Sequence, residues 1–343
     1  MKTIVCILLT YLLSILGCSK KQTVENPLQT SVDTVTIEYD IVENDYELSI
    51  QDPALFMLSW VENSDVAFIS LSDIYPLNYD DFDSLILPDV KEKEIAAAQY
   101  FELEAKYRNR FLSKTKISET DSVFVYDYSK NKLVSFVVKN LKVVAMLNFY
   151  ASESDYPYSP YDYMIGFEID TKKVEGFSDY YRGVLVYVGK ENPFTQEQLV
   201  PIVWEEISAK DYPSKEIDAE NASFLKSLAI GKTYLFEANR LQYFLQDHLE
   251  SQFNQVDFRR LLVVDSKTKD IIIEKIYGRG EGTSPSPLNY EYEYENINQW
   301  TGRLFKNKPP VVFGFEYISF GCPFISIIDK SKEDIYIYCD NRH

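Results

Sequence analysis

The sequence predicts an α+β protein built from antiparallel sheets with a few packed helices. Aromatic residues make up 15% of the chain, with 27 Tyr and 21 Phe, and such residues favour strands, as Val and Ile do. With only 12 Gly, a Gly-punctuated repeat barrel is disfavoured. The clearest helix is expected at residues 91–112. Its apolar side chains recur every three or four positions, at Ala96, Tyr100, Leu103, Tyr107 and Phe111.

The other elements follow from local patterns. A capping box of Thr195 and Gln198 predicts a helix at 195–207, although Pro201 lies within it. Further helices are expected at 219–230, which ends before Gly231, and at 234–253. Strands are expected at 33–41, 46–50, 55–61, 66–71, 122–128, 132–139, 141–149, 164–170, 182–188, 260–265, 270–277 and 311–320, and in a final hairpin at 324–328 and 335–339.

The two halves of the chain can be aligned with each other. In each, a predicted helix precedes a strand that ends in an Asp-Ser-Lys type of turn, at Asp127 and at Asp265. This order predicts two tandem related modules, 33–190 and 191–343. The same turn recurs at Asp170 and Asp329, so an irregular β-propeller is the alternative fold. The simpler explanation is that hairpin turns reuse Asp, Ser and Lys in any β-rich chain.

The N-terminus carries an export signal. After Lys2, residues 4–16 are apolar but too few to span a bilayer, and they end in Ile15-Leu16-Gly17-Cys18. This ending resembles the bacterial lipobox, with Ile in place of the commoner Leu. The resemblance implies a signal peptide at 1–17, cleavage before Cys18, and acylation of that residue. Residues 18–32 would then form the lipidated Cys and a flexible tether.

The resemblance also implies an address. The chain looks like a Bacteroidetes-type lipoprotein, although the acidic surface-export tag of that class is not evident after Cys18. Ser19 rather than Asp follows the Cys, which by similarity favours the outer membrane, facing the periplasm. Several acyl chains anchor a protein firmly, so the bilayer is one expected partner.

The charge of the chain limits the classes of partner that it can bind. A formal net charge of −18 repels nucleic acid and anionic lipid, which makes both poor partners. A basic protein or bound cations would fit better. The simpler explanation is a soluble surface that resists aggregation.

Two cysteines remain beyond the lipobox. Cys322 and Cys339 lie almost symmetrically about the polar turn at 329–334, so a hairpin would bring them together. An even pair in an exported protein predicts a disulfide. The alternative is two buried free thiols.

We find no catalytic, metal or cofactor motif in the sequence. His248 lies on the apolar face of an expected helix, and His343 ends the chain, so neither zinc nor a Ser-His-Asp triad is supported. The P-loop-like residues 231–233 lack the preceding Gly, and no helix follows the Gly-rich residues 278–282. A solvated loop is favoured over a calcium site for three acidic residues, Asp80, Asp81 and Asp83.

Tyrosine clusters are the most distinctive candidates for binding. Exposed rings with a polar tip suit protein interfaces or sugar faces, although they can equally cover the core of a sheet. The candidates are Tyr156, Tyr158, Tyr161, Tyr163, Tyr290, Tyr292, Tyr294 and Trp300.

Together these features predict a non-catalytic, membrane-tethered envelope lipoprotein that binds a protein partner or a glycan. One version is an immunity-type protein whose acidic charge steers it to a basic toxin. The alternative is an envelope hydrolase that uses paired carboxylates.

Overall fold

The structure is a computed structural model, and its described residues belong to one compact unit, Ser49–His343. The signal peptide, Cys18, the tether and the strands expected before residue 51 lie outside the described residues and stay predictions. The described residues are 53–342 apart from 62–63, 78–84, 92, 179–182, 196, 216–224, 251–254 and 290–296.

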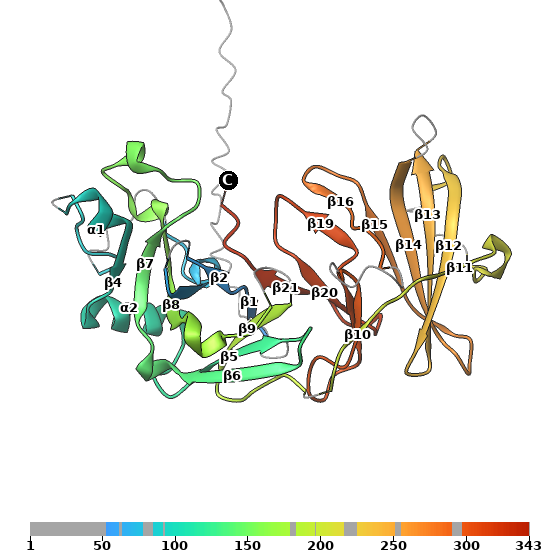
Figure 1. The fold of residues 1–343 in the computed structure, drawn as a ribbon, viewed down its shortest axis with the longest axis horizontal. Coiled ribbons are helices and arrows are strands. Elements are labelled where there is room, and N and C mark those ends of the chain that lie inside the picture. Colours follow the sequence, from blue (N-terminus) through green and yellow to red (C-terminus); the bar gives the residue numbers. More distant parts are fainter. Residues whose placement is uncertain are drawn as a thin grey trace, which may run out of the picture. The chain divides into compact units, whose positions relative to one another are not determined.

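The protein is predominantly β, so the α+β prediction is wrong. Among the described residues there are twenty-one strands and two α-helices, and the strands form several sheets, none of them closed. A nine-stranded sheet that contains both β1 and β21 is also not one of the four-stranded blades that the propeller alternative requires. Figure 1 shows the strands and the two short helices.

The largest sheet has nine strands in the order β10-β17-β18-β20-β21-β1-β9-β5-β6. β1 and β21 run parallel with Leu55 opposite Ile337, and the other neighbours are antiparallel. Strands from both sides of residue 190 thus share one sheet, and the module boundary there stays a prediction. The strands are β1 (Leu55–Phe56), β5 (Ser122–Asp127), β6 (Lys132–Val137), β9 (Val184–Gly189), β10 (Val200–Pro201), β17 (Trp300–Gly302), β18 (Val311–Phe313), β20 (Phe324–Ile327) and β21 (Ile335–Tyr338).

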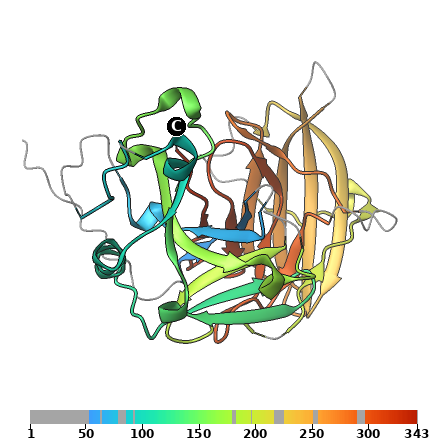
Figure 2. The same cartoon turned by 60° about the vertical axis from the view of Figure 1, so that its left-hand side comes forward.

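Two five-stranded sheets and a two-stranded sheet complete the fold. The first is ordered β2-β3-β8-β7-β4, and the second follows chain order from β11 to β15. The second forms a layer of long strands, coloured yellow to orange in Figure 2. The strands are β2 (Ser59–Trp60), β3 (Val66–Ser70), β4 (Tyr100–Glu102), β7 (Val143–Leu147), β8 (Tyr163–Asp170), β11 (Glu205–Ile207), β12 (Ala229–Ala238), β13 (Leu241–Glu250), β14 (Gln255–Asp265) and β15 (Ile271–Gly278), with β16 (Thr283–Pro285) and β19 (Glu316–Ile318) as the small sheet.

Much of the nine-stranded sheet is covered on both faces, although some residues of β6 and Tyr336 of β21 are exposed. One face forms a core with Leu55, Tyr126 and Ile325. The opposite face packs at one end, through Phe56, against the β2-β3-β8-β7-β4 sheet and α2. At its other end it packs, through Val312, against the β11–β15 sheet. Such burial explains why so many of its strands are continuous apolar runs.

The sheet curls strongly around the first of these cores. The ring of Tyr128, just beyond β5, lies 5.5 Å from Trp300 of β17 and 5.1 Å from Phe313 of β18. These strands are far apart in the order of the sheet, so only curvature can bring their side chains together. The cavity described below lies at one end of this curled sheet.

The helix predicted at 234–253 is wrong, because β12 and β13 form a hairpin there. Asn239 and Arg240 both have positive φ, +50° and +67°, which is the two-residue turn that suits antiparallel strands. The apolar spacing of four between Leu241 and Leu245 fits a helix and also one face of a strand. Of the helix predicted at 219–230, residues 219–224 lie outside the described residues and Leu225 is helical, but a turn follows and β12 begins at Ala229, so the prediction is wrong at its C-terminal end.

The first predicted helix is only partly present. Residues 91–112 are divided among α1 (Ile95–Gln99), β4 and α2 (Ala105–Thr115), and α2 ends at Lys116 in the left-handed conformation. Residues 195–207 hold β10 and β11 instead of a helix, and Pro201 lies on the edge strand β10, where a missing N–H is tolerated. The second helix of the proposed repeat is therefore absent, which removes the main support for related modules.

Candidate functional site

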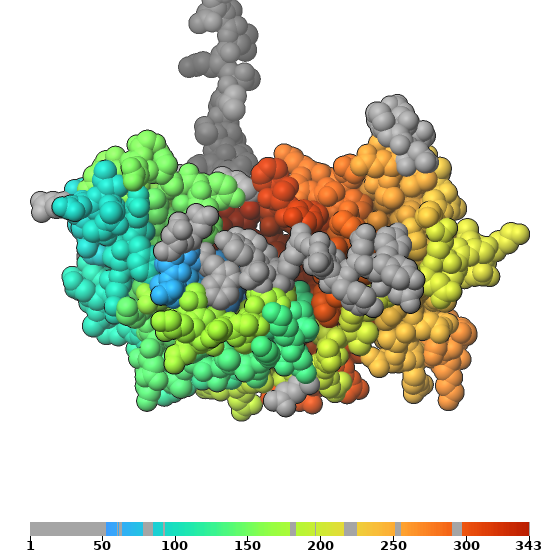
Figure 3. Space-filling view, in the orientation of Figure 1, coloured from blue at the N-terminus to red at the C-terminus, as the bar shows by residue number. Residues whose placement is uncertain are grey.

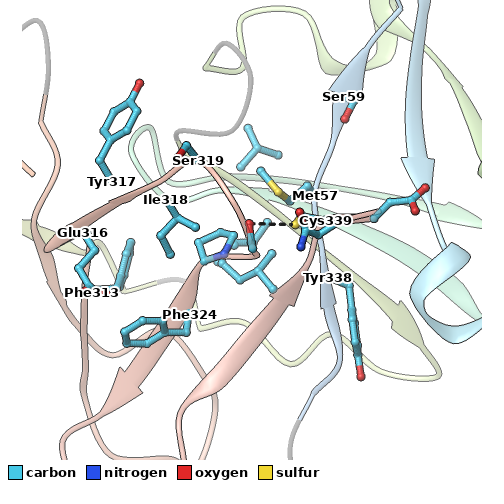
Figure 4. A pocket seen from close by; sticks show the side chains of 18 of the residues that line it. Met57, Ser59, Phe313, Glu316, Tyr317, Ile318, Ser319, Phe324, Tyr338 and Cys339 are labelled. Atoms are coloured by element: carbon cyan, nitrogen blue, oxygen red, sulfur yellow. Dashed lines mark hydrogen bonds between the residues drawn. The ribbon is translucent and has the colours of Figure 1, made fainter. Parts of the chain in front are cut away.

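A cavity of about 420 Å³ lies at one end of the nine-stranded sheet. Met57 lines it just beyond β1, Phe313 at the end of β18, Phe324 at the start of β20, and Cys339 just beyond β21 (Figure 4). One strand ends where its antiparallel neighbour begins, so these positions, which are distant in sequence, lie close together at one end of the sheet. The surface is recessed between the cyan-to-green and the orange segments, with red C-terminal segments within the recess (Figure 3).

Other sheets supply the remaining walls. Ser59, Phe68 and Ser70, which share one face of β2 and β3, line the cavity together with Met164 of β8. The three residues of β19 also line the cavity, together with Ser319 just beyond them. Most of the lining is aliphatic or aromatic, which is typical of sites that bind an apolar group.

Four large aromatic side chains are exposed around this cavity. Phe149 and Tyr150 are 66% and 68% exposed, and Tyr317 is 52% exposed; all three are lining residues. Phe320 is 57% exposed and lies between the lining residues Ser319 and Gly321. An exposed group of aromatic rings around an apolar hollow marks an interaction site rather than ordinary surface.

A glycine bend directs the chain along the cavity. Gly314, between β18 and β19, has φ +88°, and a Cβ there would lie 1.9 Å from the Asn298 carbonyl oxygen. Its own carbonyl accepts hydrogen bonds from the Ser286 hydroxyl at 2.6 Å and from the Gln299 amide at 3.1 Å. Glycine is needed here because a side chain has neither the space nor the favoured backbone conformation.

The charged groups in the lining are acidic. Glu316 and Asp340 line the cavity, and no Lys, Arg or His is among the described lining residues. Arg342 Nε donates to Asp340 Oδ1 at 2.6 Å, and the Ser70 hydroxyl donates to its other oxygen at 2.9 Å. Burial raises the pKa of Glu316, an effect opposed by the Gly278 N–H that donates to this carboxylate at 3.0 Å.

The predicted Cys322–Cys339 disulfide is confirmed, with an S–S distance of 2.03 Å. It joins the residues before β20 to those after β21, and the Cys339 Sγ lies 3.6 Å from the carbonyl oxygen of Gly321 (Figure 4). The bridge thus fixes the position of one cavity wall. The hairpin that predicted it is also present, with Ile325 opposite Ile335.

The first predicted tyrosine cluster mostly lies inside the protein. Tyr158 and Tyr163 are buried, with ring centroids 6.0 Å apart, and the Tyr163 hydroxyl donates to the Ala98 carbonyl at 2.8 Å. Tyr156 is half-buried and donates to the Lys91 carbonyl at 2.7 Å. Tyr161 is half-buried under the guanidinium of Arg342, 5.6 Å from its ring centroid.

The second cluster is described only at its end. Trp300 is buried in the core of the curled sheet, and Tyr290, Tyr292 and Tyr294 lie outside the described residues. None of the described members of the two clusters lines the cavity. Sequence reasoning missed Phe149, Tyr150, Tyr317 and Phe320, because two adjacent rings in one turn and two rings at or just beyond β19 carry no local pattern that joins them.

The minor motifs have structural roles where they are described. His248 is buried on β13, not on a helix, and Gly231 lies within β12. A Cβ on Gly282 would lie 2.6 Å from the Phe320 side chain, so this Gly-rich turn packs under an exposed aromatic ring. The acidic residues 80–83 lie outside the described residues. In the described part of the chain, no group of three His, Cys, Asp or Glu side chains is placed to hold a metal ion.

Comparison with known proteins leaves the cavity as the main guide to function. No protein-family model matches the chain, and neither a curated protein nor a solved structure matches it. Within the described residues, no helix has the length and apolar character needed to cross a membrane.

Proposed function

We propose that this protein is a non-catalytic binding protein of the bacterial envelope that recognises a protein partner through the cavity. The single observation that carries the proposal is the exposed group of Phe149, Tyr150, Tyr317 and Phe320 around an apolar hollow. Aromatic residues beside a pocket are typical of the centres of protein interfaces. The lipobox resemblance supports lipid anchoring at Cys18 and an outer-membrane position facing the periplasm.

The binding proposal is tested by capture from envelope extract of the native cell. The full chain is compared with a Phe149→Ser, Tyr317→Ser double variant and with an Ile230→Ser control. Ile230 is 61% exposed on β12 and does not line the cavity. We expect one dominant partner, identified by mass spectrometry, to be lost from the double variant alone. Equal capture by all three proteins would contradict the assignment of the surface.

Lipid anchoring is tested separately. Cys18→Ser should abolish incorporation of a labelled fatty acid and move the protein from the membrane to the soluble fraction. Lipidation requires the cysteine sulfur, and loss of the acyl chains removes most of the membrane affinity. A variant that stays on the membrane would contradict the anchor.

A hydrolase with paired carboxylates is the second candidate, since Glu316 and Asp340 both line the cavity. The contacts of Asp340 weaken it. Both oxygens of this carboxylate already accept hydrogen bonds within the protein, from Arg342 and from Ser70, so a substrate would have to compete for them.

A glycan in place of a protein is supported by the same exposed rings, because aromatic faces also stack on sugars. Capture of polysaccharide, lost in the same double variant, would favour it.

A further inference from the structure

The strand β19 has a free edge. It forms a two-stranded sheet with β16, and among the described residues no strand pairs with its other side. The Ser286 N–H donates to the Phe315 carbonyl, and the Ser319 N–H donates to the Gly282 carbonyl, both at 2.8 Å. Alternate residues from 315 to 319 therefore direct their main-chain groups toward β16.

The residues between them face the other way. Main-chain N–H and C=O groups alternate in direction along an antiparallel strand, so those of Glu316 and Ile318 point to the free edge. Within the part of the chain that the structure describes, no main-chain hydrogen bond is made by these groups of Glu316 and Ile318, and such a row of donors and acceptors is a template for another strand.

The cavity lies along this edge. All four consecutive residues from Glu316 to Ser319 line it, although successive side chains of a strand point to opposite faces. A cavity against one face would be lined by alternate residues only. The unbroken run therefore indicates that the edge itself faces the cavity, and Met57 and Ser59 lie across from it (Figure 4).

The charge of the lining selects the kind of partner. Asp340 is already paired with Arg342. The Glu316 carboxylate accepts from the Gly278 N–H, and within the described residues it has no cationic partner. A basic group from a partner would complement it, whereas a carboxylate or phosphate would be repelled.

We infer that the cavity binds an extended segment of a partner protein, which adds to the free edge of β19 as a third strand of the β16–β19 sheet. Strand addition of this kind takes affinity from main-chain hydrogen bonds and specificity from alternate side chains. Residues directly opposite each other across strands contact. An apolar residue of the partner therefore lies opposite Ile318, and a Lys or Arg two positions away lies opposite Glu316.

This inference rests on the proposed function, and its test uses peptides rather than the natural partner. A random dodecapeptide library is selected on the full chain, and enriched peptides are measured by fluorescence anisotropy. We expect enrichment of an apolar residue separated by one position from Lys or Arg. Enrichment of acidic peptides, or of none, would overturn the inference.

Peptide backbone methylation tests the edge without altering the protein. A selected peptide is N-methylated in turn at two consecutive central residues. If the peptide pairs as a strand, only one of the two methyl groups removes a donor that faces β19, and it should weaken binding about ten-fold. Two methylated peptides that bind as tightly as the parent would overturn strand addition.

Matched variants locate the contact. Ile318→Pro removes the N–H on the free edge while keeping the ladder to β16, and Ile318→Val keeps that N–H. We expect about ten-fold weaker peptide binding for the first and less than about three-fold for the second. Glu316→Gln, which still accepts from Gly278, should reduce both affinity and its dependence on salt.

The two proposals fail differently. A native partner that is lost with the Phe149→Ser, Tyr317→Ser variant but does not compete with the selected peptide would overturn strand addition and leave the binding function standing. Capture that is insensitive to that variant would contradict the binding surface itself.

Discussion

Two groups of aromatic residues in this protein are alike in composition and opposite in packing. In the core of the curled sheet, Phe194 is fully buried, 5.0 Å from the ring centroid of Tyr126 and 6.0 Å from that of Phe305. Around the cavity at the end of the same sheet, Phe149 and Tyr317 are mostly exposed. The first group stabilises the fold, and the second leaves apolar area in contact with water.

The difference arises from backbone geometry rather than residue type. The Gly314 bend and the Cys322–Cys339 bridge hold β19 and the residues before β20 in place beside the cavity. Exposed rings do not contribute the stability that burial of the same rings would give, and such a loss of stability is typical of binding sites.

The largest expected effect contrasts one ring from each group. Phe194→Ala should lower the free energy of unfolding by about 4 kcal/mol, because it removes a buried ring and leaves a void. Phe149→Ala should lower it by less than about 0.5 kcal/mol, as an exposed side chain does. Urea unfolding of both variants provides the measurement. Equal losses would show that Phe149 belongs to the core and would remove the contrast.

The disulfide should come next. Replacing Cys322 and Cys339 by Ser opens a loop with a sequence separation of 17, which should cost about 3 kcal/mol of unfolding free energy. The same change should weaken binding of a selected peptide, because Cys339 lines the cavity. Free-thiol titration of the denatured, unreduced protein is the control and should detect no thiol from this pair. Unchanged binding in the double variant would show that the wall does not depend on the bridge.

The glycine bend should have a smaller effect. Gly314→Ala places a Cβ against the Asn298 carbonyl at φ +88° and should cost about 2 kcal/mol. Gly280→Ala is the matched control in the neighbouring turn, where a Cβ would meet only the Thr283 hydroxyl within 4 Å, at 3.0 Å. Thermal unfolding compares the two. If Gly280→Ala proves the more damaging, the bend is not the constraint that shapes this side of the cavity.

The smallest effect concerns a buried polar residue that neither aromatic group contains. His248 is buried on β13, and its burial, with the positive charge of Arg260, lowers its pKa below the ordinary 6.5. At a pH below 6.5, His248 is protonated in the unfolded chain but still neutral in the folded one. The unfolded state is therefore favoured, and this residue destabilises the fold as the pH falls.

The test compares the wild type with His248→Leu at pH 7.5 and pH 5.0. The free energy of unfolding of the wild type, relative to that of the variant, should fall by about 1 kcal/mol between pH 7.5 and pH 5.0. A pKa shift of one unit contributes at most about 1.36 kcal/mol. Urea unfolding at each pH gives the difference. A difference that stays constant with pH would mean that the two states of His248 titrate alike.

Several turns could be read from the sequence because their causes are local. Asp127 and Asp265 end strands, and each accepts main-chain hydrogen bonds from the turn that follows, at 3.0 Å from Lys130 and 2.8 Å from Lys267. The strands expected at 122–128 and 260–265 are confirmed as β5 and as part of β14. Asp in such turns satisfies backbone N–H groups within three residues, so it needs no tertiary contact.

Other assignments failed because a local pattern had two solutions. An apolar residue at every fourth position suits a helix face and equally one face of a strand. In residues 229–250 the sheet decided the outcome, since β12 and β13 pair with each other and β13 pairs with β14. The candidate tyrosines were misleading for a related reason. Tyr158, Tyr163 and Trp300 are core residues, and the sequence does not tell a buried ring from an exposed one.

The sequence by itself determined the strand-rich composition, the Asp turns and the Cys322–Cys339 hairpin, all of which depend on residues fewer than twenty positions apart. Only the tertiary structure decided the cavity. Its walls come from positions as distant as Met57 and Cys339, which meet because β1 and β21 pair in parallel. A pairing across nearly the whole described chain is stabilised by burial on both faces of a sheet, and burial is a property of the assembled fold rather than of any local run of residues.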